Sequence, residues 1–323
     1  MRSRRLGRTG LSVSEIGHGL WGMGSWSGST DEESLRALQL ATEHGCTFFD
    51  SAWAYGGGRS DRLLGQLIRR NPGAPIVVAS KVPPKNLRWP ATAADPLDAV
   101  FPRDHVFASV ERIREALGVD CVDLMQFHVW DDTWAADRRW IDTVADLKAR
   151  GLIRWFGLSL NRWEPWNGLA ALRTGAVDAV QVIYNVFDQA PEDELLPLCR
   201  ELDVGVIARV PLDEGSLAGT LTKDTRFPAG DWRATYFGPE NLTQTLERVE
   251  RLKALVPPVM SLPELALRFI LHNADVATTI VGMRKEGHVR QNTGVSDGSR
   301  LPDELMAGLR THRWDRKRAP WSA

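Results

Sequence analysis

The sequence predicts a closed (β/α)8 barrel, the TIM-barrel type of α/β fold, as a single domain over residues 1–323. Eight short apolar runs alternate with amphipathic helical patterns along the chain. Continuous apolar runs are typical of parallel strands that are buried on both faces. Because no linker or low-complexity segment interrupts the series, the eight units fit one barrel.

The expected strands are short, and most of them end at a polar residue. Their ranges are Ile16–Leu20, Cys46–Phe49, Pro75–Ser80, Val122–Phe127, Ile153–Leu158, Ala179–Ile183, Val204–Ala208 and Val276–Val281. A short N-terminal β-hairpin is expected before the first of them. Since active residues of such barrels lie at the carboxyl ends of the strands, the polar residues there are the first candidates for function.

Helical patterns follow the strands, and capping signals mark several of their ends. Thr30 opens the first helix with three acidic residues behind it, and Gly45 stands where that helix ends. Further helices are expected at Arg59–Arg70, His105–Leu117, Trp134–Arg150, Pro165–Leu172, Pro191–Leu202, Leu242–Leu255, Leu262–Asn273 and Lys285–Thr293, with an extra C-terminal helix within Leu301–Arg318.

An open, doubly wound sheet is the alternative arrangement for alternating strands and helices. Such sheets carry a Gly-x-Gly-x-x-Gly turn between the first strand and its helix. Gly17, Gly19 and Gly22 have this spacing, but the expected helix opens only near residue 31. This context favours the closed barrel.

The composition argues against several classes of protein. With 40 Lys and Arg against 41 Asp and Glu, the net charge is −1, which gives no attraction to nucleic acid or acidic membranes. The three cysteines, Cys46, Cys121 and Cys199, form no Cys-x-x-Cys pair, which argues against a disulfide framework and a zinc site. The N-terminus has no signal-length apolar core, and no apolar run reaches about 18 residues. We therefore expect a cytoplasmic protein with no membrane and no nucleic-acid partner.

Four polar residues at or near strand ends make a chemically coherent set. Asp50 ends the second strand and Tyr55 follows five residues later, while Lys81 and His128 end the third and fourth strands. A nearby ammonium lowers the pKa of a phenol, which is about 10 in water, and a carboxylate keeps that ammonium charged. The imidazole can hydrogen-bond the same substrate oxygen as the phenol. The set suits protonation of the alkoxide that forms when hydride adds to a carbonyl, although each residue alone could be a turn, surface or packing residue.

The segments around these residues resemble the aldo-keto reductase superfamily. They are FFDSAWAYGGGRSDRLLGQLI (48–68), VVASKV (77–82), DLMQFHVW (123–130) and GLIRWFGLSLN (151–161), and their order matches the family from end to end. The resemblance implies an NAD(P)H-dependent carbonyl reductase on a (β/α)8 barrel, in which hydride transfer needs no metal. It also implies a catalytic tetrad with Tyr55 as the general acid, assisted by Lys81, Asp50 and His128.

The resemblance further implies where a cofactor binds. Ser159, Asn161 and Gln181 match the residues that hold the nicotinamide carboxamide, although Leu160 separates a Ser and an Asn that are adjacent in the family. The segment IVGMRKEGHVRQN (280–292) matches the family's phosphate-binding segment, where a helix N-terminus presents N–H groups to an anion. The residues expected to bind there are Gly282, Met283, Arg284, His288, Gln291 and Asn292. Because Arg284 can pair with a phosphate, NADPH is favoured, and NADH is the alternative.

The segment VIARVPLDEG (206–215) resembles the family's seventh strand and the loop after it. Arg209 stands where the family often has a Tyr, so the usual aromatic platform for the nicotinamide is missing. A guanidinium also stacks on rings, less favourably beside the cationic oxidised ring than beside the neutral reduced one. We expect Arg209 to contact the nicotinamide and favour reduction, and the alternative is an ion pair with Asp213 or Glu214. The other residues expected to bind the cofactor here are Pro211, Leu212, Gly215 and Leu217.

Tryptophan is unusually frequent, with 13 Trp against 3 Tyr. Five of the tryptophans fall in loops expected at the mouth of the barrel, namely Trp21, Trp26, Trp53, Trp89 and Trp130. Small-molecule pockets are mostly apolar with few polar groups. We therefore expect Trp21, Trp53, Trp89 and Trp130 to bind an apolar or aromatic carbonyl substrate, and the alternative is that they pack the loops.

Two other functions stay open at this point. Some members of the superfamily act as cofactor-sensing subunits bound to other proteins, with the nucleotide site retained and little turnover. A lyase or isomerase built on the same barrel would use no nicotinamide. A lyase or isomerase differs from a reductase in that it would not bind a nicotinamide nucleotide. A cofactor-sensing subunit differs from a reductase in that it would show little turnover.

Overall fold

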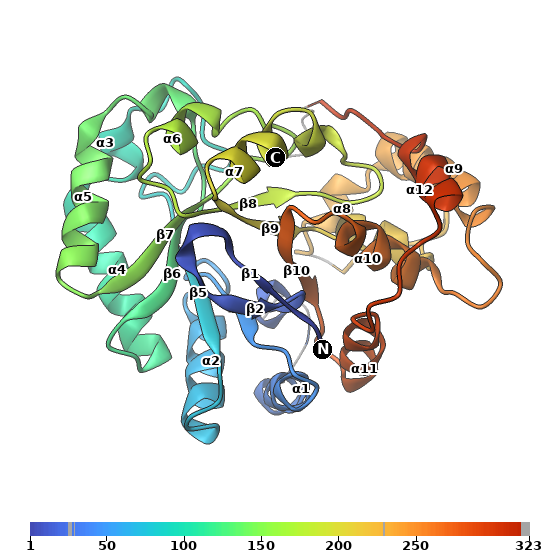
Figure 1. Ribbon diagram of the computed structural model, residues 1–323, viewed down its shortest axis with the longest axis horizontal. Helices are drawn as coiled ribbons and strands as arrows, with labels where there is room; N and C mark the ends of the chain where they lie inside the picture. The colour runs from blue at the N-terminus through green and yellow to red at the C-terminus, as the bar shows by residue number, and fades with distance from the viewer. Residues whose placement is uncertain (25–27, 29, 229, 318–323) are drawn as a thin grey trace.

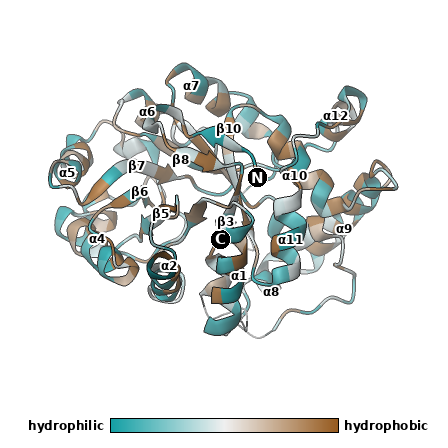
Figure 2. Ribbon diagram, turned by 60° about the horizontal axis from the view of Figure 1, so that its bottom comes forward, coloured by the Kyte–Doolittle hydropathy of each residue, from teal (hydrophilic) through white to brown (hydrophobic). Residues whose placement is uncertain are grey.

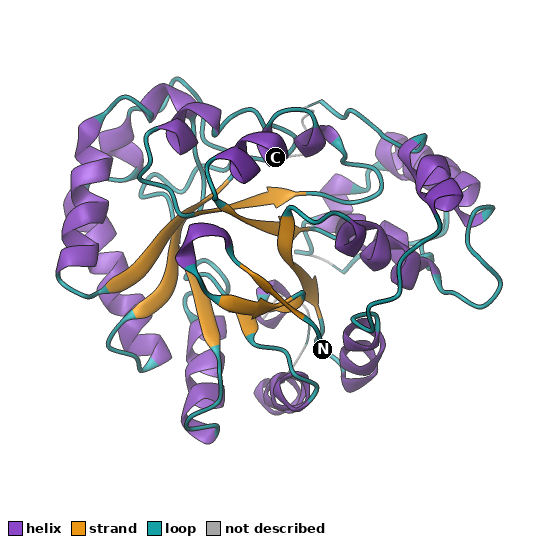
Figure 3. Ribbon diagram, viewed as in Figure 1, coloured by secondary structure: helices purple, strands orange, loops and turns teal. Residues whose placement is uncertain are grey.

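The computed structural model describes residues 1–323 except residues 25–27, 29, 229 and 318–323. Its centre is a barrel of parallel strands, each of which overlaps a predicted apolar run. The strands are β3 (Ile16–Gly19), β4 (Phe48–Asp50), β5 (Val77–Val82), β6 (Val122–Phe127), β7 (Ile153–Ser159), β8 (Ala179–Ile183), β9 (Gly205–Arg209) and β10 (Val276–Gly282). They pair in the order β10-β3-β4-β5-β6-β7-β8-β9 and close into a barrel, which confirms the predicted fold class (Figure 3).

Side chains that alternate along the strands separate the barrel interior from the layer under the helices. An apolar cluster in the interior includes Phe48, Ala79, Leu124 and Ala179, which come from β4, β5, β6 and β8. Since residues i and i+2 of a strand point to the same face, the residues two positions later point inward as well. Those residues are all polar and buried, namely Asp50, Lys81, Gln126 and Gln181.

A hairpin covers the other end of the barrel. β1 (Ser3–Arg5) pairs antiparallel with β2 (Ser12–Ser14), as predicted. Leu6 and Val13 are fully buried and belong to the same apolar cluster as the inward-facing strand residues. The hairpin therefore closes the amino end of the barrel, and the polar layer lies toward the carboxyl end (Figure 1).

Helices surround the barrel and turn their apolar sides toward it (Figure 2). They are α1 (Asp31–Glu43), α2 (Arg59–Arg70), α3 (Leu97–Val100), α4 (Arg103–Leu117), α5 (Arg138–Ala149), α6 (Leu169–Arg173), α7 (Leu195–Glu201), α8 (Arg233–Tyr236), α9 (Pro239–Lys253), α10 (Leu262–His272), α11 (Glu286–Gly294) and α12 (Asp303–Arg310). Short 3-10 turns lie at η1 (Gly7–Thr9), η2 (Trp21–Met23), η3 (Asp132–Trp134), η4 (Ala190–Glu192) and η5 (Asp213–Ala218).

Local capping explains where several helices begin. Thr30 and Glu33 form the capping box of α1, in which the Thr30 hydroxyl accepts from the Glu33 N–H. The helix predicted from Trp134 begins instead at Arg138, because the Asp137 side chain accepts from the Arg139 N–H and caps α5 there. The helix predicted from Pro165 also begins later, at Leu169.

In the part of the chain that the structure describes, no helix is long and apolar enough to cross a membrane. No group of three or more His, Cys, Asp and Glu side chains is placed to hold a metal ion in that part either. The three cysteines are free thiols.

Candidate active site

Two of the four inward-facing polar residues form a buried ion pair. Nζ of Lys81 lies 2.6 Å from Oδ2 of Asp50, and the two side chains are 0% and 1% exposed. The ammonium also donates to the Ser51 carbonyl at 2.8 Å. A buried charge pair is stable only when its other hydrogen-bonding groups are satisfied as well.

The second oxygen of Asp50 has donors of its own. Nε2 of Gln181 donates to Asp50 Oδ1 at 2.8 Å, and Nε2 of Gln126 lies 3.4 Å from the same atom. The parallel register brings these groups together, since Lys81 pairs with Gln126 on the next strand. The carboxylate is thus held on both oxygens at the centre of the barrel.

Tyr55 approaches this pair from the turn between β4 and α2. Its hydroxyl lies 3.5 Å from Nζ of Lys81. The turn continues through Gly58, whose φ is +81° and where an added Cβ would lie 2.6 Å from the Trp53 ring. Only glycine fits both conditions, so Gly58 fixes the path that returns the chain from Tyr55 to α2.

The surroundings of Tyr55 act on its hydroxyl in opposite directions. Burial raises the pKa of Tyr55 above the ordinary value, and the neighbouring Lys81 ammonium partly lowers it again. The hydroxyl therefore stays protonated at neutral pH and lies beside a charge that would stabilise it once the proton has left.

His128 lies across from Tyr55 at the end of β6. The two ring centroids are 5.7 Å apart and the rings are inclined at 75°. Burial, together with the Lys81 and Arg209 charges, holds the pKa of His128 well below its usual range, so the imidazole is neutral. Its Nδ1 is buried and has no hydrogen-bond partner within the described ranges.

Together, a protonated phenol beside an ammonium and a neutral imidazole can deliver a proton to one substrate oxygen. The ammonium stabilises the phenolate that remains, and the imidazole can orient the oxygen. The structure thus brings the four predicted tetrad residues into one constellation.

The three residues expected at the carboxamide lie in different surroundings. Ser159 is buried at the carboxyl end of β7, and Gln181 contacts Asp50. The side-chain nitrogen of Asn161 donates to the carbonyls of Ala91 at 3.1 Å and Trp130 at 2.9 Å, so it ties two loops together. Its Oδ1 is buried without a partner among the described residues.

Arg209 ends β9 at the mouth of the barrel. Its Nη2 donates to the Leu160 carbonyl at 2.9 Å, and Nε has no partner in the described part of the chain. Burial, helped by Arg162, lowers the pKa of Arg209 to about 10. The alternative ion pairs are not formed, because Glu214 pairs with Arg162 at 2.8 Å and Asp213 pairs with Arg316 at 2.7 Å.

The two segments expected to bind phosphate lie on β9–η5 and β10–α11. Leu217 of η5 is fully buried, while Gly282 at the end of β10 is exposed with open space above it. Met283 is buried, and its carbonyl contacts Nε2 of His18 at 3.2 Å. Burial lowers the pKa of His18 to about 4, so this contact is made by a neutral ring that donates from Nε2.

Arg284 lies against the turn after β3. A Cβ added to Gly22 would lie 2.9 Å from Cδ of Arg284, so glycine makes room for this side chain. Burial lowers the pKa of Arg284, and the nearby carboxylates of Asp231 and Glu33 act against that shift. Of the residues on α11, His288 and Gln291 are exposed and Asn292 is buried.

The predicted tryptophans do not share one environment. Trp89 is 39% exposed and lies edge-on to His128, with ring centroids 5.7 Å apart. Trp21 contacts Trp232 edge-on at 5.7 Å, and Trp53 packs under the guanidinium of Arg112 at 5.1 Å.

Trp130, by contrast, is 0% exposed and packs edge-on against Trp134 and Trp140. The Trp89 ring therefore lies beside His128, whereas the Trp130 ring is buried against Trp134 and Trp140. Trp26 lies outside the described residues.

Sequence reasoning missed two parts of the site. Gln126 belongs to the polar layer, and its position two residues before His128 on one strand was a signal that could have found it. The buried cluster of Arg316 with Asp188 and Asp213 had no such signal, because Arg316 lies 128 and 103 residues from the two aspartates.

Comparisons with known proteins agree with this geometry. The profile of the Aldo/keto reductase family matches residues 15–313. The NADH-specific methylglyoxal reductase of Escherichia coli (strain K12) is 29% identical over 313 residues, which cover 90% of this chain and 92% of that protein.

Two solved structures are similar over nearly the whole chain. The holo form of an aldo-keto reductase from Bacillus halodurans superposes with a TM-score of 0.77 at 22% identity and covers 100% of both chains. An aldo-keto reductase from Klebsiella pneumoniae in complex with NADPH gives a TM-score of 0.68 at 25% identity and covers 95% of this chain and 93% of that one.

Proposed function

This chain belongs to the aldo/keto reductase family, and on that premise we propose that it is an NAD(P)H-dependent oxidoreductase that reduces an aldehyde or a ketone to an alcohol. The observation that carries the proposal is the position of Nζ of Lys81, 2.6 Å from Asp50 and 3.5 Å from the Tyr55 hydroxyl. An ammonium placed in this way favours loss of the phenolic proton at the moment when a substrate oxygen needs it.

In the proposed reaction Tyr55 is the general acid. When bound, the reduced nicotinamide supplies the hydride that adds to the carbonyl carbon. The Tyr55 hydroxyl donates its proton to the carbonyl oxygen, and the Lys81 ammonium stabilises the phenolate that remains. The neutral His128 imidazole holds the same oxygen in position, and Asp50 keeps Lys81 in place.

The residues at the carboxyl end of the barrel fit an anionic dinucleotide. Gly282 leaves open space where β10 leads toward the N-terminus of α11, and Arg284 supplies a cation beside it. We assign the adenosine phosphates to Gly282, Met283, Arg284, His288, Gln291 and Asn292, and the nicotinamide and pyrophosphate to Ser159, Asn161, Gln181, Arg209, Pro211, Leu212, Gly215 and Leu217.

The cofactor we assign is NADPH, with NADH as the alternative. The Klebsiella pneumoniae structure holds NADPH, whereas the Escherichia coli relative is described as NADH-specific. The cationic side chain of Arg284 supports the phosphorylated form, since a guanidinium pairs with a phosphate through two hydrogen bonds.

For the substrate we propose an apolar or aromatic carbonyl compound. Trp89 supports this assignment, because its ring is partly exposed and contacts His128. Trp21 and Trp53 extend the proposed substrate wall. Trp130 was expected to belong to the same wall, and its full burial gives it a supporting role in the proposal, beneath the loop that follows His128.

The test follows the oxidation of NADPH and of NADH with a panel of aromatic, aliphatic and sugar carbonyls. We expect turnover with hydrophobic carbonyls, and in Tyr55→Phe a fall in kcat of about 10²- to 10⁴-fold with NADPH binding retained. Tyr184→Phe is the matched control, since that hydroxyl bonds Glu192 and Asn273 away from the tetrad.

Nucleotide binding without turnover on any carbonyl would instead support a cofactor-sensing subunit. Absence of binding to either nucleotide would overturn the reductase proposal and favour a lyase or isomerase on the same barrel.

A further inference from the structure

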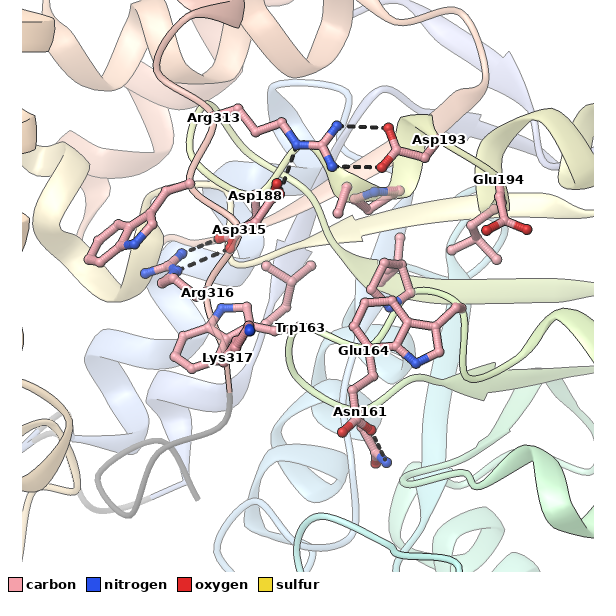
Figure 4. A pocket seen from close by; sticks show the side chains of 18 residues that line it. Asn161, Trp163, Glu164, Asp188, Asp193, Glu194, Arg313, Asp315, Arg316 and Lys317 are labelled. Carbon is pink, nitrogen blue, oxygen red and sulfur yellow. Dashed lines mark hydrogen bonds and ion pairs between the residues drawn. The ribbon is translucent and has the colours of Figure 1, made fainter.

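Residues 313–317, the C-terminal strap, follow α12 and cross the loops at the carboxyl end of the barrel. A cavity of about 310 Å³ lies between this strap and the segments that follow β7 and β8 (Figure 4). On one wall of it, Arg316 points inward with a side chain that is only 2% exposed. A guanidinium buried this completely needs a specific set of partners.

Arg316 has such partners on all sides. Its Nη2 lies 2.7 Å from Oδ1 of Asp213, and Nε and Nη2 both contact the Asp188 carboxylate. Nη1 donates to the Tyr236 hydroxyl at 2.9 Å. Its Cζ lies over the rings of Trp163 and Trp314, 4.9 Å and 4.8 Å from their centroids.

Both carboxylates are connected to the loop that follows β9. Oδ2 of Asp213 accepts from the Ser216 hydroxyl at 2.6 Å, within η5. Asp188 accepts from the side chain of Asn185 at 2.8 Å, and Asn185 also donates to the Val210 carbonyl at 3.0 Å. Arg316 thus holds residues 210–216 at both ends of that segment.

Residues 210–216 include backbone conformations that are unfavourable for residues other than glycine. Val210, Asp213 and Glu214 are not glycine, yet their φ values are +57°, +44° and +55°. Such conformations persist only where surrounding contacts hold them. The ion pair between Arg162 and Glu214 supplies one contact, and the Arg316 cluster supplies the others.

We propose that Arg316 is a positioning residue for the cofactor, which holds residues 210–217 in the conformation that binds the dinucleotide. The inference rests on the proposed function, in which Arg209, Leu212, Gly215 and Leu217 bind that cofactor. The strap then sets the affinity for the cofactor. The rate of the chemical step is set by the tetrad of Asp50, Tyr55, Lys81 and His128.

Loss of the guanidinium would leave two buried carboxylates, Asp188 and Asp213, without their cation. Like charges in a buried place repel each other and draw in water. The segment could then relax out of its positive φ values, away from the shape that fits the pyrophosphate. The hydrogen bonds of Arg316 go to Asp188, Asp213 and Tyr236, and within the described residues none goes to the tetrad, so the proton transfer itself stays intact.

A double-mutant cycle on Arg316→Gln and Asp213→Asn tests the inference. The Kd for NADPH is measured by fluorescence titration, and kcat is measured at saturating NADPH. We expect each single variant to raise Kd by roughly tenfold, and the double variant to raise it little further, because both changes break the same contact. In all three variants kcat should change by less than about twofold, since the interaction lost acts on binding alone.

Arg313→Gln is the matched control. Arg313 lies on the same strap, and its guanidinium pairs with the exposed Asp193 at 2.6 Å and with Asp315 at 2.7 Å (Figure 4). Its Kd for NADPH should equal that of the wild type. Circular dichroism shows whether Arg316→Gln folds. If it does not, Asp213→Asn still tests the inference, because in that variant the buried Arg316 guanidinium retains its ion pair with Asp188.

The outcomes separate the two proposals. Failure of the wild-type chain to bind either nicotinamide nucleotide would overturn the proposed function and this inference with it. Two other results would overturn the inference alone, provided that the wild type binds the nucleotide. One is an unchanged Kd for NADPH in Asp213→Asn, and the other is an equal loss of kcat and of NADPH affinity in the variants.

Discussion

Nε2 of Gln181 lies 2.8 Å from Oδ1 of Asp50, the carboxylate oxygen that Lys81 does not occupy. Each oxygen of the carboxylate therefore has its own donor, and the plane of the carboxylate is fixed. Because Lys81 is held from this side, its ammonium lies within reach of the Tyr55 hydroxyl. An amide from β8 thus orients the β4 carboxylate that holds the Lys81 ammonium of β5.

Lys81→Met should change the pH dependence of alcohol oxidation. The Lys81 charge lowers the pKa of Tyr55 and the Asp50 charge raises it, so removing Lys81 raises this pKa further. In the proposed mechanism, oxidation uses the Tyr55 phenolate as base, so its pH profile should shift to higher pH, with kcat at neutral pH reduced about tenfold or more. The profile of kcat against pH measures this shift.

Lys148→Met is the control for that experiment, since Lys148 pairs with Asp178 on the outer layer of the barrel. It should leave the profile in place. An unshifted profile in Lys81→Met would show that the ammonium does not act on Tyr55.

Trp89→Ala should weaken substrate binding, whereas Trp130→Ala should lower stability. Trp89 is 39% exposed, so its loss should raise KM for aromatic carbonyls with little change in melting temperature. Trp130 is 0% exposed and packs on two other tryptophans, so its loss should lower the free energy of unfolding by about 3–5 kcal/mol. Steady-state kinetics and urea unfolding measure the two effects, and an unchanged KM in Trp89→Ala would remove that residue from the proposed substrate wall.

Asp61→Asn should remove a pH-dependent loss of stability. Asp61 is fully buried, accepts from the Ser80 hydroxyl at 2.9 Å, and burial raises its pKa to about 6. Folding thus favours the neutral acid, so this stabilisation is complete below about pH 4 and is lost as pH rises through about 6. Relative to Asp61→Asn, the wild type should lose about 2 kcal/mol of unfolding free energy between pH 4 and pH 7.

Urea unfolding of both proteins across that range isolates the Asp61 contribution, because all other groups titrate alike in the two. A constant difference between wild type and variant at every pH would contradict the prediction.

Arg209→Tyr should change the preference between oxidised and reduced cofactor. In the proposed complex the guanidinium contacts the nicotinamide, which is cationic only when it is oxidised. The variant should therefore gain affinity for NADP⁺ relative to NADPH by roughly tenfold, which corresponds to about 1.4 kcal/mol. Comparable affinity ratios in wild type and variant, measured by titration calorimetry, would contradict the proposed contact.

The barrel and the tetrad follow from local rules that the sequence carries. Each strand is an apolar run, and Phe48 with Asp50, or Leu124 with Gln126, shows how period two carries a polar residue to the end of an inward face. The start of α5 was less accessible, since the side-chain cap of Asp137 outweighs the apolar pattern before it.

Two properties could not be predicted from the sequence, namely the direction in which a side chain points and contacts between residues far apart in the chain. Trp130 stands two residues past His128 in the sequence, but which way its ring turns depends on Trp134 and Trp140. Arg316 reaches Asp213 across 103 residues and Asp188 across 128, and no local pattern encodes such a contact.

The position of Arg316 also has a consequence for biosynthesis. A ribosome releases all eight strands and the tetrad before it reaches codon 316, so the nascent barrel can close while Asp188 and Asp213 still lack their cation. A chain truncated after α12 would contain all eight strands but would lack the contact between Arg316 and Asp213 in the loop after β9. The chain thus completes its eight strands before synthesis adds Arg316, whose guanidinium contacts Asp213 of the 210–217 segment.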